Sequence, residues 1–486
     1  MDYCQNSFKD RTEIIKKPGG KLPGFFCYLC RMKTDNRKTA PWPLVAYGMI
    51  GASISGVTFI SVPGNVMAQN FFYIPLVLGF CLGYAVVAEL LLPLYYRQNL
   101  TSIYGFIATR FGDASHKTAG VAFMISRLLG AAVRVFAAIV VLNAFVPAAI
   151  RETVPAWLVV AVISAVFMLC IFLYSYRGGV HALVWTDVIQ TTFMLLAVGL
   201  AIYFICRNSG LGFGGVMSAA AATQVPGYEG VCNIWNPFDW NWSHGTNVIK
   251  QLVSGVFITI AMTGLDQSMI QKSLSCKDLG AAKKNMYMTA LNILLVNIFF
   301  LTLGMLLCWY VLGNGGMEAL GISRTDEIFP VVARLLGPAV SVIFVIGLIS
   351  ACLPSAGNAL VALTTSFCSD FLGSDSRRKT VMSCFAALFV IIAVVLQVIS
   401  SDAVINLIYK IASYTYGPLL GIFAFGIFTD LKANDKATPW VAAASPLICL
   451  ALNYLLGRFA GFDLGFTLLI VNGLLTFLGL YLFRKR

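Results

Sequence analysis

The chain has 486 residues, of which 58% are hydrophobic and only 11% are charged, and its mean hydropathy is +0.81. This composition excludes a water-soluble globular protein, which could not bury so much apolar surface. The long uncharged runs predict an all-α, polytopic membrane protein, and they are too long and too continuous for a transmembrane β-barrel. The net charge of +13 fits Lys and Arg in cytoplasmic loops better than nucleic-acid binding, and we expect no nucleic-acid partner.

About twelve membrane spans are predicted along the chain, after a polar and basic segment at 1–40 that lacks the features of a signal peptide. The predicted spans cover 43–68, 72–95, 118–146, 155–175, 186–206, 247–271, 285–313, 338–369, 380–399, 403–428, 439–457 and 461–483. Most Lys and Arg fall in alternate loops, such as Lys283 and Lys284 after the sixth span. This pattern predicts that the N- and C-termini are both cytoplasmic.

The first and sixth spans are interrupted by weak helix formers. The first reads "MIGASISGVTFISVPG" at Met49–Gly64, and the sixth contains "SGVFITIAMTG" at Ser254–Gly264. A break in a membrane helix is tolerated where the freed backbone groups face protein, water or a ligand, and paired breaks at matching positions indicate the binding site of a transporter. The alternative is a small-residue face that lets helices pack closely.

Two arginines in the third span, Arg127 and Arg134, are seven residues apart and therefore share one helix face. Arginine inside a membrane is costly and usually functional, and a guanidinium binds a carboxylate through two parallel hydrogen bonds. Arg134, nearer the middle of the span, is our candidate for binding an anionic substrate group. The alternative is an internal ion pair with Glu89 of the second span.

An enzyme is not expected, because no cluster of catalytic His, Asp or Ser residues shares one depth in the membrane. The cysteines inside the spans are interpreted as small packing residues. Asp266 and Gln267, at the end of the sixth span, are expected to make structural hydrogen bonds rather than to contact the substrate.

Six motifs, in order, resemble the sodium/solute symporter family, the relatives of sodium–glucose and sodium–proline cotransporters. They are "ASISGVTFISVPG", "YRQNLTSIYGFIATRFG", "RGGVHALVWTDVIQ", "GLDQSMIQKSL", "ISACLPSAGNALVALTTSFCSD" and "YTYGPLLGIFAFG". The resemblance covers about residues 36 to 430. It implies a LeuT-type fold in a core at 41–430, with inverted five-helix repeats at about 43–206 and 247–428, and two additional helices in 431–486. Most relatives carry one more span ahead of the core, which is absent here. We expect either that this chain begins inside the cell, as the loop charges allow, or that the gene start is altered.

The resemblance also implies a sodium ion as the coupling ion, at a site between the first and eighth core helices. This site maps onto the carbonyls of Gly51, Ile54 and Ala351 and onto the hydroxyl of Ser355. Sugar-transporting relatives carry a second serine where this chain has Pro354, and proline has no hydroxyl.

A second sodium site or exit path is implied at two further positions. Its candidates are Asp187 and Thr364, or the neighbouring Thr365. Asp187 has the alternative or additional role of capping the N-terminus of the fifth span.

The candidate substrate pocket combines six residues, each of which has simple packing as its alternative role: Ser53, Thr58, Ser61, Arg134, Thr259 and Tyr414. A sugar is disfavoured, because the sixth span lacks the Asn and Tyr that line the pocket of sugar-transporting relatives.

The predicted function is sodium-coupled secondary active uptake of a small organic solute by alternating access, with a carboxylate as the leading candidate. Alternatives are a proton-coupled or sodium-independent transporter of the same fold, or a transporter-like sensor. We expect a monomeric multi-pass protein of a bacterial inner membrane, with the lipid bilayer and a small-molecule substrate as its partners.

Overall fold

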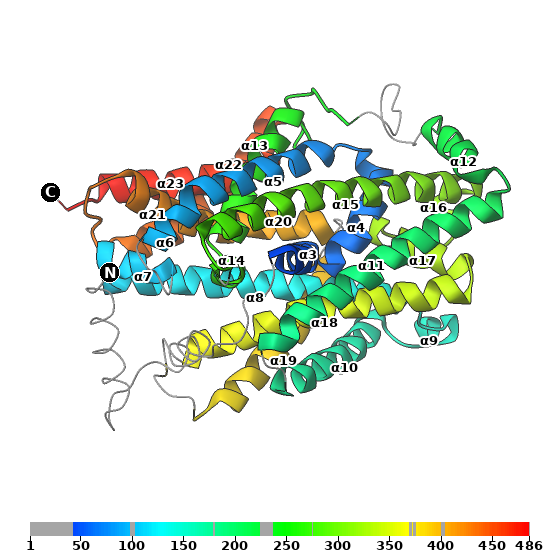
Figure 1. Ribbon diagram of the computed structural model, residues 1–486, viewed down its shortest axis with the longest axis horizontal. Coiled ribbons are helices and arrows are strands. Elements are labelled where there is room, and N and C mark those ends of the chain that lie inside the picture. The colour runs from blue at the N-terminus through cyan, green and yellow to red at the C-terminus, as the bar shows by residue number, and fades with distance from the viewer. Residues whose placement is uncertain are drawn as a thin grey trace.

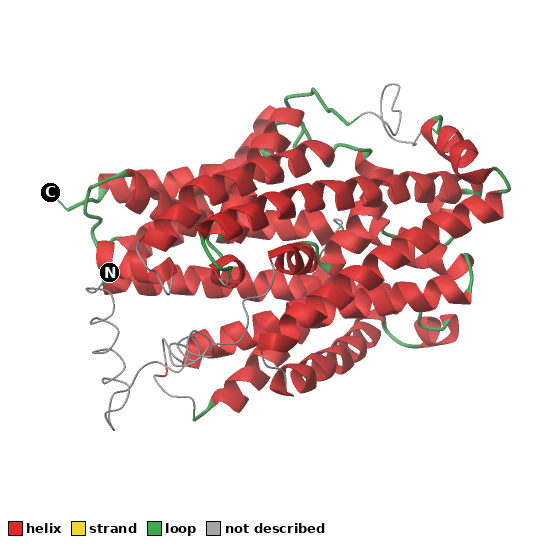
Figure 2. Ribbon diagram, in the orientation of Figure 1, coloured by secondary structure: helices red, strands yellow, loops and turns green. Residues whose placement is uncertain are grey.

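The computed structural model describes residues 42–97, 103–177, 180–223, 237–274, 276–368, 372, 376–399 and 404–485. Over these ranges the chain folds into helices joined by loops, without a strand (Figure 2). Within them, nine helices are long and apolar enough to cross a membrane, or ten if the bent pair α20 (Val404–Thr415) and α21 (Gly417–Phe428) forms one span. The prediction of a multi-pass helical membrane protein is confirmed.

The long helices lie side by side along the longest axis of the molecule (Figure 1). They are α5 (Ile74–Val86) continued by η1 (Val87–Leu91) and α6 (Leu92–Arg97), α8 (Asp113–Ala144), α10 (Ala156–Arg177), α11 (Val180–Ser209), α15 (Leu279–Gly313), α18 (Pro338–Phe367), α19 (Arg378–Ile399), α22 (Thr438–Ala460) and α23 (Leu468–Leu482).

Short elements gather at the two ends of the bundle (Figure 1). One end has α9 (Ala148–Thr153), α12 (Gly212–Ala221) and α16 (Gly316–Ala319), and the other has α6 and α7 (Ile103–Arg110). The connection that leads into α18 contains η3 (Thr325–Glu327) and α17 (Ile328–Leu335), and η5 (Gly465–Thr467) precedes α23.

Both predicted interruptions are present. The first expected span consists of α3 (Trp42–Ser53) and α4 (Gly56–Gln69), with Ile54 and Ser55 outside either helix. The sixth begins as α13 (Val248–Thr259), passes into the π-helix η2 (Ile260–Gly264) and resumes as α14 (Gln267–Leu274). Because these pieces are short, a count by helix length gives fewer spans than the twelve expected.

Small residues also bring helices into close contact, so the alternative role predicted for them applies as well. A Cβ atom at Gly56 would collide with the Cys352 sulfur of α18, and one at Gly64 would collide with the Thr325 carbonyl of η3. Gly79 of α5 and Gly255 of α13 approach each other's helix backbone in the same way. Glycine therefore permits both the break in the first span and its packing.

Helices on the outside of the bundle present apolar side chains. On α10, Val166 and Leu169 are each 57% exposed, and on α19, Val398 is 73% exposed. Such a surface is stable only against lipid. The predicted bilayer partner is therefore confirmed.

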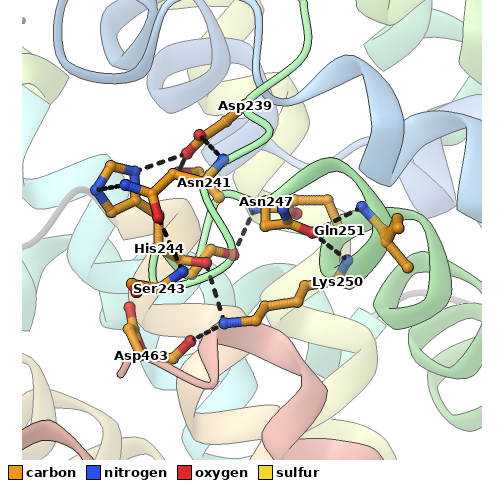
Figure 3. A network of polar contacts seen from close by, with 11 residues as sticks. Asp239, Asn241, Ser243, His244, Asn247, Lys250, Gln251 and Asp463 are labelled. Atoms are coloured by element: carbon orange, nitrogen blue, oxygen red, sulfur yellow. Dashed lines mark hydrogen bonds and ion pairs between the residues drawn. The ribbon is translucent and has the colours of Figure 1, made fainter. Parts of the chain in front are cut away.

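A polar network outside the spans joins the 237–247 segment to the loop between α22 and α23 (Figure 3). The ammonium group of Lys250 donates hydrogen bonds to the carbonyls of His244, at 3.2 Å, and Asp463, at 2.5 Å. Asp239 accepts hydrogen bonds from Thr246 and His244 and from the backbone of Asn241. Burial alone would raise the pKa of Asp239, but these hydrogen bonds outweigh it and hold the pKa below its ordinary value.

Candidate functional site

The break between α3 and α4 frees two backbone carbonyls. Ser55 is extended, with φ −86° and ψ 172°, so the helical hydrogen-bond pattern stops there. In an unbroken helix Gly51 and Ile54 would accept hydrogen bonds from the amides of Ser55 and Thr58, and the structure shows neither bond. These are the two carbonyls of this helix that the sequence assigns to the sodium site.

A glutamine side chain from α11 binds both freed carbonyls. The Nε2 atom of Gln190 donates to the oxygen of Gly51 at 2.7 Å and lies 3.4 Å from the oxygen of Ile54. Gln190 is only 1% exposed. Gln190 is not among the predicted sodium residues, although it ends the quoted motif "RGGVHALVWTDVIQ".

Helix α18 lies against the same break. A Cβ atom built at Gly56 would lie 3.6 Å from the Cβ of Ala351, and one at Gly347 would lie 3.2 Å from the Phe193 carbonyl of α11. Ala351 is fully buried, and Ser355 lies one helical turn further along α18 and is partly exposed. The structure thus places Gly51, Ile54 and Ala351 in one region, with Ser355 on the adjoining turn.

Among the remaining predicted sodium residues, the structure describes the side chain of Thr364 but not that of Asp187. The side chains of Asp187 and Pro354 lie outside the described part of the structure. Because α11 begins at Val180, two turns before Asp187, the predicted helix-capping role of Asp187 is wrong. The hydroxyl of Thr364 is buried and donates to the Leu360 carbonyl of its own helix at 2.7 Å.

One tyrosine connects the two interrupted spans. The hydroxyl of Tyr84 on α5 lies 3.0 Å from the Ser53 hydroxyl at the end of α3, and it also hydrogen-bonds Thr263 in η2. One helix further along, the hydroxyl of Tyr95 donates to the carbonyl of Gly264 at 2.9 Å. Helices α5 and α6 therefore hold both breaks, a role that the sequence did not reveal.

Arg134 faces a small cavity, about 10 Å³ in volume, which is the space of a single water molecule. Helix α8, the π-helix η2 and helix α20 enclose it, and its lining comprises Ser126, Arg127, Gly130, Arg134, Met262, Ile408, Ile411, Ala412 and Tyr416. Over the described residues Arg134 has no ion-pair partner, and its Nε atom is buried without a hydrogen-bond acceptor.

The alternative pairing of Arg134 with Glu89 is wrong. Glu89 forms an ion pair with Lys283 of α15, at 2.5 Å, and accepts a hydrogen bond from the Tyr287 hydroxyl, at 3.0 Å. Glu89 lies within the π-helix η1, whose extra residue per turn rotates its side chain from the direction that a regular helix predicts.

Arg127, which lies seven residues before Arg134 on the same face of α8, has a carboxylate partner. Its guanidinium lies 2.7 Å from Asp266, and the two side chains are 13% and 1% exposed. The other oxygen of Asp266 accepts the backbone N–H of Met269 at the start of α14. Asp266 therefore fixes the second half of the interrupted sixth span to α8, in line with its predicted structural role.

The other predicted substrate residues do not line this cavity. Thr58 is buried on α4, and Ser61 lies beside Asp326 of η3. Thr259 packs against Gly83 of α5. Tyr414 instead lies beside Asn453 of α22, and over the described residues its buried hydroxyl has no hydrogen-bond partner. The tyrosine at the cavity is Tyr416, at the bend of 49° between α20 and α21.

Comparisons with known proteins agree on one family. The model of the sodium:solute symporter family matches residues 34–439. The sodium-coupled monocarboxylate transporter 2 of Danio rerio is 26% identical over 402 residues, covering 80% of this chain and 62% of that protein. The sodium/sialic acid symporter NanT of Aliivibrio fischeri is 22% identical over 478 residues, covering 95% of this chain and 86% of the relative.

Two solved structures share the fold. A substrate-bound, outward-open sodium-coupled sialic acid symporter superposes with a TM-score of 0.69 at 19% identity, covering 94% of this chain and 96% of its own. Mhp1, a nucleobase-cation-symport-1 family transporter in a closed conformation, gives a TM-score of 0.51 at 14% identity, covering 91% and 92%. The predicted LeuT-type fold and the prediction of a transporter rather than an enzyme are confirmed. The chain belongs to the sodium:solute symporter family.

Proposed function

We propose that the chain is a sodium-coupled secondary active transporter that carries a small organic anion across the membrane by alternating access. The observation that carries the substrate class is Arg134, a guanidinium at an internal cavity with no ion-pair partner over the described residues. A buried cation inside a membrane protein is costly unless an anion or a set of acceptors accompanies it. A substrate carboxylate would supply that partner through charge-assisted hydrogen bonds.

The chemical character of the cavity lining, rather than its one-water volume, agrees with an organic acid. Met262, Ile408 and Ile411 give it an apolar wall beside the guanidinium, which suits a ligand with one charged end and a carbon skeleton. Relatives of this chain are named for the transport of monocarboxylates and of sialic acid, both of which are acids. These names support an anionic substrate here, without identifying it.

We assign sodium to the break in the first span. Its ligands would be the carbonyls of Gly51, Ile54 and Ala351 and the hydroxyl of Ser355, with Asp187 and Thr364 on a second site or an exit path. Unwound carbonyls that replace hydration water are how broken membrane helices bind small cations.

The proposal includes the arrangement in the membrane. The distribution of loop charges supports both termini on the cytoplasmic side. The proposed membrane is a bacterial inner membrane, and the proposed working unit is a monomer. The core at 41–430 consists of two inverted repeats, at about 43–206 and 247–428, followed by two further helices in 431–486.

The test is ligand-dependent thermal stabilisation of the purified protein, measured with a panel of carboxylates and neutral sugars in either NaCl or KCl. A ligand that binds only the folded state raises stability by about 2.7 kcal/mol at a hundredfold excess over its Kd. We expect a carboxylate to stabilise the protein in sodium and not in potassium. Stabilisation by sugars alone would contradict the anionic substrate, and a response that is equal in both salts would contradict sodium coupling.

Variants of Arg134 test whether this residue binds the substrate carboxylate. Arg134→Gln should weaken carboxylate binding roughly tenfold to a hundredfold, the value of a hydrogen bond to a charged group, and should retain stabilisation by sodium alone. Arg134→Lys should recover part of the loss, because it keeps the charge without the bidentate geometry. Arg458→Gln, the same substitution at an exposed position on α22, is the matched control. Unchanged carboxylate binding in Arg134→Gln would reject the assignment.

A further inference from the structure

The side chain of Gln190 occupies the part of the structure to which the proposed function assigns sodium. Its Nε2 atom is within 3.4 Å of both the Gly51 and the Ile54 oxygens, so it lies between them. An ion bound to both carbonyls would have to lie in the same space. The amide and the ion therefore exclude each other there.

The chemistry fixes which end of the amide faces the break. Carbonyl oxygens only accept hydrogen bonds, and the NH₂ group of glutamine is the end that carries two donors. Its hydrogens present partial positive charge to the same lone pairs that a cation would use. Because Gln190 is 1% exposed, water has little access to replace it.

The position of Gln190 is held by its own helix. Helix α11 packs on α3, where the hydroxyls of Tyr47 and Thr192 lie 3.1 Å apart, and on α18, where Phe193 contacts Gly347. The Gln190 amide therefore reaches the break from α11, which contacts both α3 and α18, the two helices of the proposed ion site. A long and flexible glutamine side chain can leave such a site by rotating, without movement of its backbone.

We propose that Gln190 is an internal competitor of sodium. Its amide satisfies the carbonyls of Gly51 and Ile54 when no ion is bound, and sodium must displace it to bind. Gln190 then sets the sodium affinity, because every ion bound costs the hydrogen bonds of the amide. This inference rests on the sodium site of the proposed function.

The experiment measures the thermal stability of the purified full-length chain against sodium concentration, with KCl added to keep the ionic strength constant. The variant is Gln190→Leu, which has a similar size and no donors. Loss of one net hydrogen bond to the ion-free state corresponds to about a fivefold change in an equilibrium constant. We expect the half-saturating sodium concentration to fall about fivefold. The midpoint in sodium-free KCl should also fall, so that sodium stabilises the variant more than the wild type.

Gln251→Leu is the matched control. Gln251 is also a buried glutamine, 4% exposed, but it lies at the start of α13 and its amide faces Gly245, at 3.5 Å. Its substitution should leave the half-saturating sodium concentration unchanged. A sodium response that shifts equally in both variants would overturn the proposal, because the effect would then be one of general stability.

Other results with Gln190 variants would also overturn the proposal that Gln190 competes with sodium. A weaker or absent sodium response in a folded Gln190→Leu protein would show that Gln190 is a ligand or a brace, and a shift below about twofold would show that it has no role. If the leucine variant does not fold, Gln190→Met keeps the length of the side chain and removes both donors without adding a charge. Half-saturating sodium should again fall about fivefold, and no change would overturn the proposal.

Ser355→Ala separates this inference from the sodium site on which it depends. If the alanine variant binds sodium more weakly while Gln190→Leu is unchanged, only the inference about Gln190 fails. If the wild type itself shows no stabilisation by sodium, the sodium site fails and the inference fails with it.

Discussion

Replacing Asp266 by Asn removes the carboxylate that faces Arg127 and tests how the interrupted sixth span is held in place. The N–O distance of the pair is 2.7 Å, and the side chains of Arg127 and Asp266 are only 13% and 1% exposed. This is the buried regime, in which removal of one partner costs about 3–5 kcal/mol because the other charge keeps its desolvation penalty. The exposed pair of Asp113 and Lys117, at 75% and 59% exposure, belongs to the regime of about 0–1 kcal/mol.

We expect Asp266→Asn to lower the free energy of unfolding by about 3 kcal/mol, toward the lower end of that range, since asparagine can still accept the Met269 amide and cap α14. Asp113→Asn, the same substitution on an exposed pair, should cost less than about 1 kcal/mol. The assay is unfolding of the purified protein in mixed micelles as the fraction of SDS rises, with the circular dichroism of the helices as the readout.

A double-mutant cycle separates the pair from its surroundings. Arg127→Met combined with Asp266→Asn should be less destabilised than the sum of the two single changes by at least about 1 kcal/mol, because neither charge then remains buried. Strictly additive effects, or an Asp266→Asn protein within about 1 kcal/mol of the wild type, would refute the reasoning that this pair is a buried anchor.

Three further outcomes follow from the structure. Gly255→Ala should destabilise the protein by about 1–3 kcal/mol in the same SDS titration, because its Cβ would collide with the Leu76 carbonyl, whereas Gly130→Ala, which has open space, should not; equal effects would contradict this packing. In the folded state the pKa of Asp239 lies below its ordinary value of 3.8, so the Asp239 carboxylate stabilises the fold above pH 3.8 and this contribution is lost as the pH falls through the folded pKa. The thermal midpoint should therefore fall less between pH 6 and pH 3 in Asp239→Asn than in the wild type. Midpoints that fall in parallel in the two proteins would contradict this linkage. Asp435 accepts backbone hydrogen bonds from the first turn of α8, and Asp435→Ala should cost about 0.5–2 kcal/mol in the SDS titration, with no loss contradicting this capping role.

The interrupted helices were predictable because their signal is local. Gly51, Ser53, Ser55 and Gly56 are poor helix formers at the centre of an apolar run, and a membrane helix can break there only where the freed backbone groups face protein, water or a ligand. The break at Ile54 and Ser55 lies within that cluster. The same reasoning predicted an interruption in the sixth span, but not that it would be a π-helix.

The partners of the site residues were not predictable, because they depend on long-range contacts and on small rotations. Arg127 and Asp266 are 139 residues apart, and nothing in either segment specifies their pairing. Glu89 lies in a π-turn, which changes the direction of its side chain, and it pairs with Lys283 of α15 rather than with Arg134 of α8. Similarly, Tyr416, at the bend after α20, lines the cavity, whereas Tyr414 lies beside Asn453 of α22.

The most direct test of the central claim is uptake of a labelled carboxylate into liposomes that contain the purified protein, with an inward sodium gradient or an equal potassium gradient. The carboxylate that stabilises the wild type in sodium is the substrate to use. We expect it to accumulate above its external concentration only with the sodium gradient. At a carboxylate concentration near the wild-type Kd, Arg134→Gln should strongly reduce this accumulation, whereas Arg458→Gln should not. Equal uptake in sodium and potassium, or undiminished uptake by Arg134→Gln, would contradict this claim.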